Sequence, residues 1–137
     1  MTVLAATPLD LDILCALDPH LDRKTQEQKI ARNEVIVCWD GDEIVGVVRY
    51  SLFWDKIPFI NWLWVKEENR VQGIGRALMA SIVREARRLD QNLILTSTQS
   101  DEPGQHFYRK IGFRDIGGFV LGDEPLEIIL SLKVADA

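Results

Sequence analysis

The chain has 137 residues, of which 47% are apolar and 27% are charged. This length and composition are typical of one globular domain over residues 1–137, and they exclude disordered, collagen-like and low-complexity classes. Sixteen basic and twenty-one acidic residues give a net charge of −5, with a pI near 5.0. That acidic balance argues against nucleic acid as a partner, because non-specific binding to it depends on a positive field.

The cysteines and the apolar runs bear on the compartment. Cys15 and Cys38 lie in apolar stretches without a C-x-x-C pair, so both are expected to be reduced residues of the core. The N-terminal segment carries Asp10 and Asp12 and no basic residue before Arg23, which is unlike a signal peptide. No run reaches the roughly 18 apolar residues of a membrane span. We therefore expect a cytoplasmic protein with no membrane partner.

The first half of the chain combines two helical patterns with β-branched runs. Pro8 suits a helix start, and apolar residues recur at helical spacing from there until Pro19. Asp40-Gly41-Asp42 separates two β-branched runs and is typical of a hairpin turn, because Gly and Asp tolerate positive φ. The expected elements are an edge strand at 2–6, helices at 8–18 and 22–32, and strands at 34–39, 43–53 and 58–65.

From Gly73 the pattern changes to that of an amphipathic helix. Ile74, Leu78 and Ile82 begin an i, i+4 series that continues to Leu89. Further along, the expected elements are a strand at 93–98, a short helix at 103–111, and strands at 113–121 and 126–133. This order predicts an α/β (α+β) fold with a single mixed sheet.

A glycine-containing turn, R-x-x-G-x-G, joins the strand at 58–65 to the long helix. Gly73 and Gly75 would let the backbone approach a ligand, and the start of a helix favours a phosphate group. The plain alternative is a loop in which the glycines serve only the turn. A P-loop fits less well because Arg76-Ala77 follows Gly75, and a dinucleotide fold lacks its third glycine at Leu78.

A second motif, H-F-Y-R-K-I-G-F around Tyr108, follows the glycine turn at a distance of 33 residues from Gly75. Together with the element order, the two motifs resemble the GNAT superfamily of acyl-CoA-dependent N-acetyltransferases over about residues 33–133. The string T-S-T-Q-S at 96–100 is similar to a subgroup of small bacterial members. The resemblance implies a central sheet with helices on both faces and two parallel strands, 59–65 and 93–98, that splay apart around the cofactor.

The resemblance also implies a site for acetyl-CoA, with coenzyme A as product. The pantetheine arm is expected to pair with the backbone of Leu63, Trp64 and Val65, like an added strand. The pyrophosphate is expected on the N–H groups of the turn, with the Arg70 side chain closing the loop. The expected pyrophosphate-binding residues are Arg70, Val71, Gln72, Gly73, Ile74, Gly75 and Arg76.

The expected reaction is direct attack of a primary amine on the thioester, through a tetrahedral intermediate. The backbone N–H of Val65 would stabilise the oxyanion. Tyr108 stands at the family's position for the general acid, because a phenol is protonated at neutral pH and can donate to the leaving thiolate. The alternative is that Tyr108 packs, with its hydroxyl merely hydrogen-bonded to the sulfur.

The general base is left open by the sequence. The strand at 59–65 carries no carboxylate, and its polar residue is Asn61. Four carboxylates lie near in sequence, although each is more typical of a solvated loop: Asp55, Glu67, Glu68 and Glu124. Asp101 departs from the family pattern, which places an Asn there to contact the pantetheine arm, so that contact is in doubt.

Aromatic residues and histidines offer weaker signals. Trp62 and Trp64 lie two apart and would share one face of a strand, either as packing between helix and sheet, which we favour, or as a wall for an acceptor. His106 would point about 100° away from Tyr108 on a helix, which argues against a shared role. No cluster of residues has the spacing of metal ligands.

The function expected from the sequence is therefore an N-acetyltransferase for an unidentified amine, either a small molecule or a protein. The alternative is a non-catalytic acyl-CoA sensor or interaction module on the same fold. A weaker reading, a nucleic-acid binder, would use Arg84, Arg87 and Arg88. Dimers are frequent in the superfamily, and homodimer formation is left open.

Overall fold

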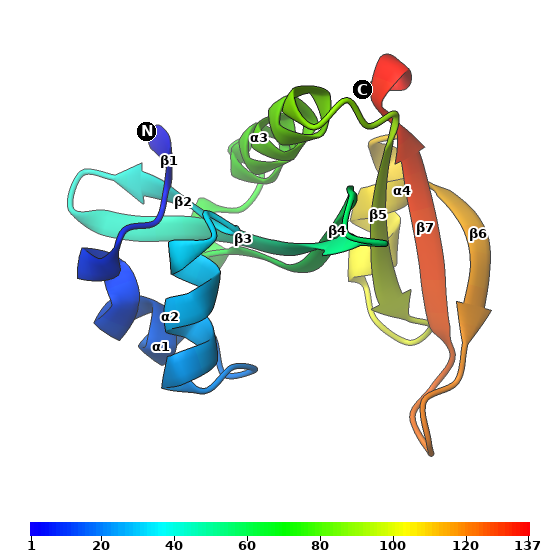
Figure 1. The fold of residues 1–137 in the computed structure, drawn as a ribbon, viewed down its shortest axis with the longest axis horizontal. Coiled ribbons are helices and arrows are strands. Elements are labelled where there is room, and N and C mark those ends of the chain that lie inside the picture. The colour runs from blue at the N-terminus through cyan, green and yellow to red at the C-terminus, as the bar shows by residue number, and fades with distance from the viewer. The chain divides into compact units, whose positions relative to one another are not determined.

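A computed structural model describes all of residues 1–137 (Figure 1). Its residues form two compact units, Met1–Tyr50 with Trp62–Ser81, and Ser51–Asn61 with Ile82–Ala137. The strands are β1 (Thr2–Ala5), β2 (Val35–Asp40), β3 (Glu43–Phe53), β4 (Ile57–Val65), β5 (Leu93–Gln99), β6 (Arg114–Phe119) and β7 (Glu127–Lys133). The α helices are α1 (Leu11–Leu17), α2 (Arg23–Ala31), α3 (Ile74–Arg88) and α4 (Gly104–Lys110), with 3-10 turns at Pro8–Asp10, Glu67–Asn69 and Val134–Asp136.

The strands of the first unit follow the order β1-β2-β3-β4. β1 pairs antiparallel with β2 from Thr2↔Trp39 to Ala5↔Ile36, and β2 pairs antiparallel with β3. The turn between β2 and β3 contains Gly41 at φ +61°, which confirms the hairpin expected at this position. Asp22 caps α2 by accepting a hydrogen bond from the Thr25 N–H at 2.7 Å.

Side chains along β2 and β3 point alternately to the two sides of the sheet, so the first unit is packed on both faces. On one face, α1 and α2 lie against the strands (Figure 1), and their apolar residues form a core cluster with Val35, Val37 and Val47. On the other face, the first half of α3 comes so close to β3 that a Cβ at Gly46 would lie 2.7 Å from Ile74 Cγ2. Gly46 is thus required by close packing. The expected helices on both faces of the sheet are confirmed here.

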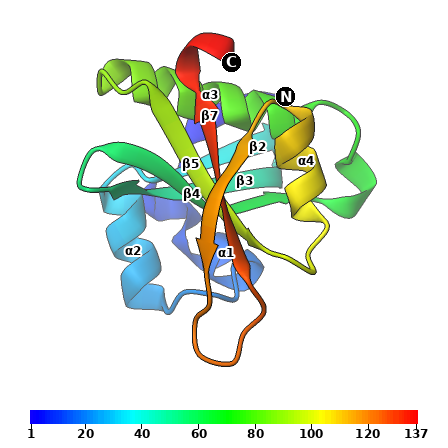
Figure 2. The ribbon, with the colours of Figure 1, turned by 90° about the vertical axis from the view of Figure 1, so that its right-hand side faces the viewer.

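The second unit contains the strand order β3-β4-β5-β7-β6, with β7 between β5 and β6 (Figures 1 and 2). β4 and β5 are parallel, pairing at Phe59↔Leu95 and Ile60↔Thr96. β5 pairs antiparallel with β7 along its whole length, and β6 pairs antiparallel with β7. The mixed sheet expected from the element order is therefore present.

The expected elements are found with shifts of one or two residues at most ends. The predicted strand 113–121 ends earlier, since β6 stops at Phe119 before the hairpin loop. Cys15 and Cys38 are both free, but only Cys38 is buried, because Cys15 lies at the margin of the core cluster. No helix is long and apolar enough to cross a membrane. The expectation of a single domain stays a prediction.

Candidate acyl-CoA site

The loop between β4 and α3 is fixed to the sheet at its start. The Lys66 N–H donates to the Val45 carbonyl at 2.8 Å, and the Lys66 ammonium pairs with Glu43. A short 3-10 turn follows, in which the Asn69 N–H donates to the Lys66 carbonyl at 2.9 Å. These bonds place the following glycine turn close to the end of β4 in the first unit.

The glycine turn has the backbone geometry of an anion site. Val71 and Gly73 have φ of +61° and +82°, and the Val71 side chain is fully exposed. The first backbone bond of the long helix runs from the Ala77 N–H to the Gly73 carbonyl. The N–H groups of Ile74, Gly75 and Arg76 therefore precede the helical ladder, at the positive end of the helix. Nothing lies within 4 Å of a Cβ built at Gly73, so the turn is open on that side.

The two arginines of the turn differ in their contacts. Arg70 Nε donates to the carbonyl of Val65 at 3.2 Å, so this side chain ties the turn to the end of β4. Arg76 lies on the exposed side of the first helical turn. The carbonyl of Val65, one of the residues expected to pair with pantetheine, is thus already partly engaged by the protein.

The segment expected to pair with pantetheine lies at the C-terminal end of β4 and is half-buried; it consists of Leu63, Trp64 and Val65. Trp62 and Trp64 share one face, as their spacing predicts, with ring centroids 6.2 Å apart and ring planes 18° apart. Both rings pack partly on the core cluster beneath α1 and α2. The packing interpretation of this pair is therefore confirmed, although each ring keeps an exposed part.

Tyr108 is buried in the second unit, on α4, with 7% of its surface exposed. Its ring makes an edge contact with Phe113 at 5.2 Å, and its hydroxyl is hydrogen-bonded with Thr96 of β5. The Thr96 hydroxyl in turn donates to the Ile60 carbonyl of β4 at 3.0 Å. Burial, opposed by the bond with Thr96, raises the pKa of Tyr108 to about 12, so the phenol is protonated at neutral pH.

A second threonine of β5 was missed by the sequence reasoning. Thr98 lies two residues after Thr96 and shares its face of the strand. Its hydroxyl oxygen is buried and has no hydrogen-bond partner in the protein. A buried polar atom without a partner in the protein is rare, and Gln26 Oε1 is the other such atom. In the sequence, only the two-residue period of a β-strand, applied to T-S-T, indicates that these two threonines share a face.

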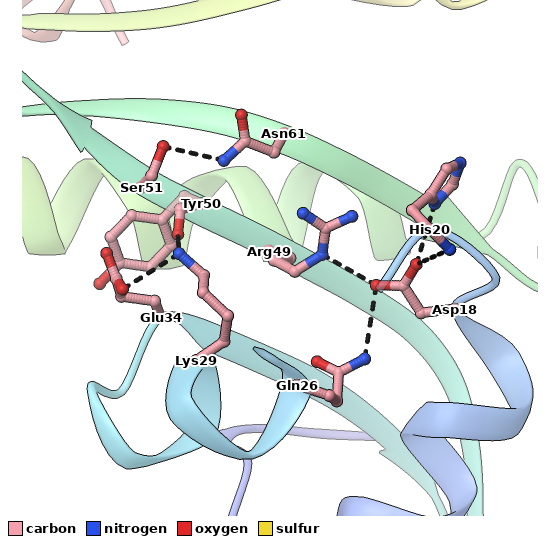
Figure 3. Close-up of polar contacts among 9 residues, drawn as sticks. All are labelled: Asp18, His20, Gln26, Lys29, Glu34, Arg49, Tyr50, Ser51 and Asn61. Atoms are coloured by element: carbon pink, nitrogen blue, oxygen red, sulfur yellow. Dashed lines mark hydrogen bonds and ion pairs between the residues drawn. The ribbon is translucent and has the colours of Figure 1, made fainter. Parts of the chain in front are cut away.

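None of the carboxylates considered as the base is buried. All four are exposed, as is Asp101; the four are Asp55, Glu67, Glu68 and Glu124. Glu124 accepts a bond from Gln99 Nε2 at 3.2 Å, and Asn61 of β4 donates to Ser51 Oγ at 2.9 Å (Figure 3). The structure therefore gives these carboxylates no buried partner that would orient one of them as a base.

A polar cluster that the sequence did not predict lies under α1 and α2 in the first unit (Figure 3). Asp18, 1% exposed, forms an ion pair with Arg49 of β3, whose Nε lies 2.8 Å from its Oδ2. His20 and Gln26 also contact this carboxylate. We call Asp18, His20, Gln26 and Arg49 the Asp18 cluster.

The burial of Tyr108 makes the folded protein sensitive to alkali. The unfolded phenol titrates near pKa 10, whereas the fold raises this pKa to about 12. Because the folded state holds the proton more tightly, stability is unaffected below about pH 10 and falls by about 2–3 kcal/mol as the pH approaches 12. Urea unfolding at increasing pH should show a steeper alkaline loss for wild type than for Tyr108→Phe. Equal losses would contradict this assignment.

The acetyltransferase (GNAT) family model matches residues 8–113, which include β4, the glycine turn, α3 and Tyr108. The chain belongs to the acetyltransferase (GNAT) family. This confirms the family expected from the sequence. The expected roles of individual residues stay predictions.

Relatives of this GNAT chain agree in sequence and fold. It is 30% identical over 105 residues to YvbK of Bacillus subtilis, described as an uncharacterized N-acetyltransferase. That match covers 75% of this chain and 66% of YvbK, so the chain spans just under two-thirds of that relative. Ard1 from Thermoplasma volcanium shares the fold with a TM-score of 0.81 at 18% identity, over 96% of both chains. YncA from Salmonella typhimurium, solved with acetyl-CoA, has a TM-score of 0.79 at 15% identity, over 98% of this chain and 94% of its own.

Proposed function

We propose that this GNAT chain transfers an acetyl group from acetyl-CoA to a primary amine. The observation that carries the proposal is the turn before α3, where Val71 and Gly73 have positive φ and the N–H groups of Ile74, Gly75 and Arg76 precede the helical ladder. Such a turn suits a pyrophosphate, because backbone donors and the helix dipole both favour an anion. The exposed guanidinium of Arg76 adds positive charge beside it.

In this proposal the last residues of β4 hold the pantetheine arm. Leu63, Trp64 and Val65 would offer backbone N–H and carbonyl groups, as an edge strand does for an extended peptide. The thioester supplies the activated acetyl group, and the N–H of Val65 would stabilise the negative charge that develops on the acetyl oxygen.

Tyr108 would serve the leaving sulfur. The raised pKa of Tyr108, about 12, keeps the phenol protonated, so a proton is available. The thiol of coenzyme A has a pKa of roughly 8.5, so its thiolate is a weaker base than the Tyr108 phenolate. Proton transfer from Tyr108 to a free thiolate would therefore be uphill. We therefore propose that Tyr108 acts as general acid in concert with cleavage of the C–S bond, so that no free thiolate forms, and that the proton released by the attacking amine restores the phenol.

The amine acceptor is proposed only by class. The relatives support an acceptor with an amine, and the chain's net charge of −5 suits a cationic one. A cytoplasmic location and the oligomeric state stay predictions. The non-catalytic alternative, a module that binds acyl-CoA without turnover, is distinguished from the enzyme by the kinetics of Tyr108→Phe described in the Discussion.

Calorimetric titration with acetyl-CoA tests the proposed site. Wild type is expected to bind in the micromolar range, and Gly73→Trp to lose at least about tenfold in affinity, because its side chain would fill the open side of the turn. Gly41→Trp is the matched control, since Gly41 also has positive φ and open space but lies in the β2–β3 hairpin turn. Folded wild type that fails to bind at millimolar acetyl-CoA would contradict the proposal, as would equal losses in both variants.

A further inference from the structure

The Asp18 cluster contains a histidine that is held by a buried carboxylate. Asp18 is the residue after α1, and His20 lies in the short turn before α2. One carboxylate oxygen, Oδ1, accepts from the His20 backbone N–H at 3.0 Å and lies 2.9 Å from Nδ1 of the ring. The other, Oδ2, accepts from Arg49 Nε at 2.8 Å (Figure 3). The carboxylate is thus fixed from both sides before any ligand arrives.

The charge of Asp18 decides how the ring of His20 is protonated. Burial by itself raises the pKa of Asp18, but the bonds from the His20 N–H, from Arg49 and from the His20 ring outweigh it, so the pKa lies below its ordinary value. An ionised carboxylate only accepts hydrogen bonds, so Nδ1 must carry the hydrogen. In the neutral ring, Nε2 then keeps its lone pair.

The second ring nitrogen of His20 points away from Asp18 (Figure 3). The His20 side chain is 57% exposed, whereas Asp18 behind it is 1% exposed. The His20 ring makes an edge contact with Trp62 of β4 at 5.9 Å, and the Arg49 guanidinium lies 5.9 Å from the centre of the same indole. His20 therefore stands beside the strand segment that begins at Trp62 and leads into Leu63, Trp64 and Val65.

We propose that His20 is the general base for the acceptor amine, held in its tautomer by Asp18. This inference rests on the proposed acetyl transfer. Nε2 takes one proton from the substrate ammonium, R–NH3⁺, which becomes neutral R–NH2 with a lone pair free to attack. The positive charge moves to the imidazolium, which the Asp18 carboxylate stabilises, and the proton then passes to water.

This arrangement meets a requirement that the exposed carboxylates do not. An alkylammonium with a pKa of roughly 10 is almost entirely protonated at neutral pH, so attack needs a positioned proton acceptor. His20 combines an accessible nitrogen with a buried orienting partner, the pattern that recurs in acid–base sites. Arg49 is the other charged group facing the ring, and its charge is paired with Asp18.

A purely structural role would be to fasten the turn between α1 and α2. The bond that fastens it most directly runs from the His20 backbone N–H to Asp18, and this bond survives any replacement of the ring. His20→Ala is therefore expected to fold normally. His106→Ala is the matched control, because His106 is the only other histidine and lies exposed on α4.

The test measures thiol release from acetyl-CoA with spermidine, tryptamine and a short alanyl peptide as amine probes, with and without added imidazole. His20→Ala is expected to lose about 100-fold or more in kcat and to regain much of it with imidazole. Its Kd for acetyl-CoA should match wild type, and His106→Ala should behave as wild type throughout. Loss of less than about threefold, or loss that imidazole does not restore, would overturn the assignment of the base.

A second measurement does not depend on turnover. Long-range ¹H–¹⁵N NMR spectra of wild type should show the neutral His20 ring with hydrogen on Nδ1 and none on Nε2. Hydrogen on Nε2 would overturn the inference even in an active enzyme. Wild type that binds acetyl-CoA but releases no thiol with any probe contradicts the proposed acetyl transfer itself, and the base with it.

Discussion

Replacement of Tyr108 by phenylalanine is expected to lower kcat by about 100- to 10,000-fold, the range typical of a positioned general acid. The buried hydroxyl, bonded with Thr96, is the group proposed to support the leaving sulfur. Phenylalanine keeps the edge contact with Phe113, so the packing of α4 should persist. The Kd for acetyl-CoA should change little, because the turn before α3 supplies the proposed pyrophosphate contacts. Steady-state kinetics and calorimetry on the same samples measure the two effects separately.

Tyr50→Phe is the matched control, because the chain has two tyrosines and both are buried. The Tyr50 hydroxyl donates to the Asn33 carbonyl at 3.2 Å, so its removal should affect stability and leave kcat near wild type. A loss of only about tenfold in Tyr108→Phe would indicate a hydrogen bond to the sulfur without proton transfer. An unchanged kcat would remove Tyr108 from the mechanism, whereas wild type that binds acetyl-CoA without any turnover would favour the non-catalytic module.

Arg49→Met should lower the free energy of unfolding by about 3–5 kcal/mol, because it leaves the Asp18 carboxylate buried without its cation. Both side chains are almost fully buried, 8% and 1% exposed, so water cannot replace the lost contact. Methionine retains much of the apolar volume of the arginine stem, which limits the effect of an empty space. Urea unfolding monitored by circular dichroism measures the change.

Two further variants test whether the loss comes from the uncompensated charge. Asp18→Asn with Arg49→Met removes both charges, while Asn can still accept from the His20 N–H, so much of the stability should return. Arg23→Met breaks an ion pair with Asp12 that is exposed on both sides and should stay close to wild type. If the double variant were as unstable as Arg49→Met alone, packing and not charge would explain the loss.

The local sequence predicted most of the helices and strands, because the spacing of apolar residues differs between a helix and a strand. The i, i+4 series from Ile74 gives α3, and the β-branched runs give β2, β3 and β4. The glycine turn was also predictable, since glycine is the residue that most readily adopts the positive φ found at Gly73. The positive φ of Val71 was not predictable, because β-branched residues rarely have positive φ.

Long-range polar contacts could not be predicted in the same way. Asp18 precedes Pro19 and has the sequence context of an ordinary helix end. Arg49 has the context of a polar residue in a strand, and 31 positions separate the two. Their pairing depends on how α1 and α2 pack against β3. The same packing buries Gln26 and Lys29 of α2. Charge patterns along the chain do not encode such tertiary neighbours.

The stacked indoles of Trp62 and Trp64 give the protein an optical signal of its own. Both rings absorb in the near ultraviolet, so β4 contributes to the near-ultraviolet circular dichroism and to the fluorescence, beside the two other tryptophans of the chain. The guanidinium beside Trp62 makes that signal sensitive to the local field. Because the pair is part of the strand proposed to hold pantetheine, occupancy of that strand can be followed in unlabelled protein, during a titration and in real time.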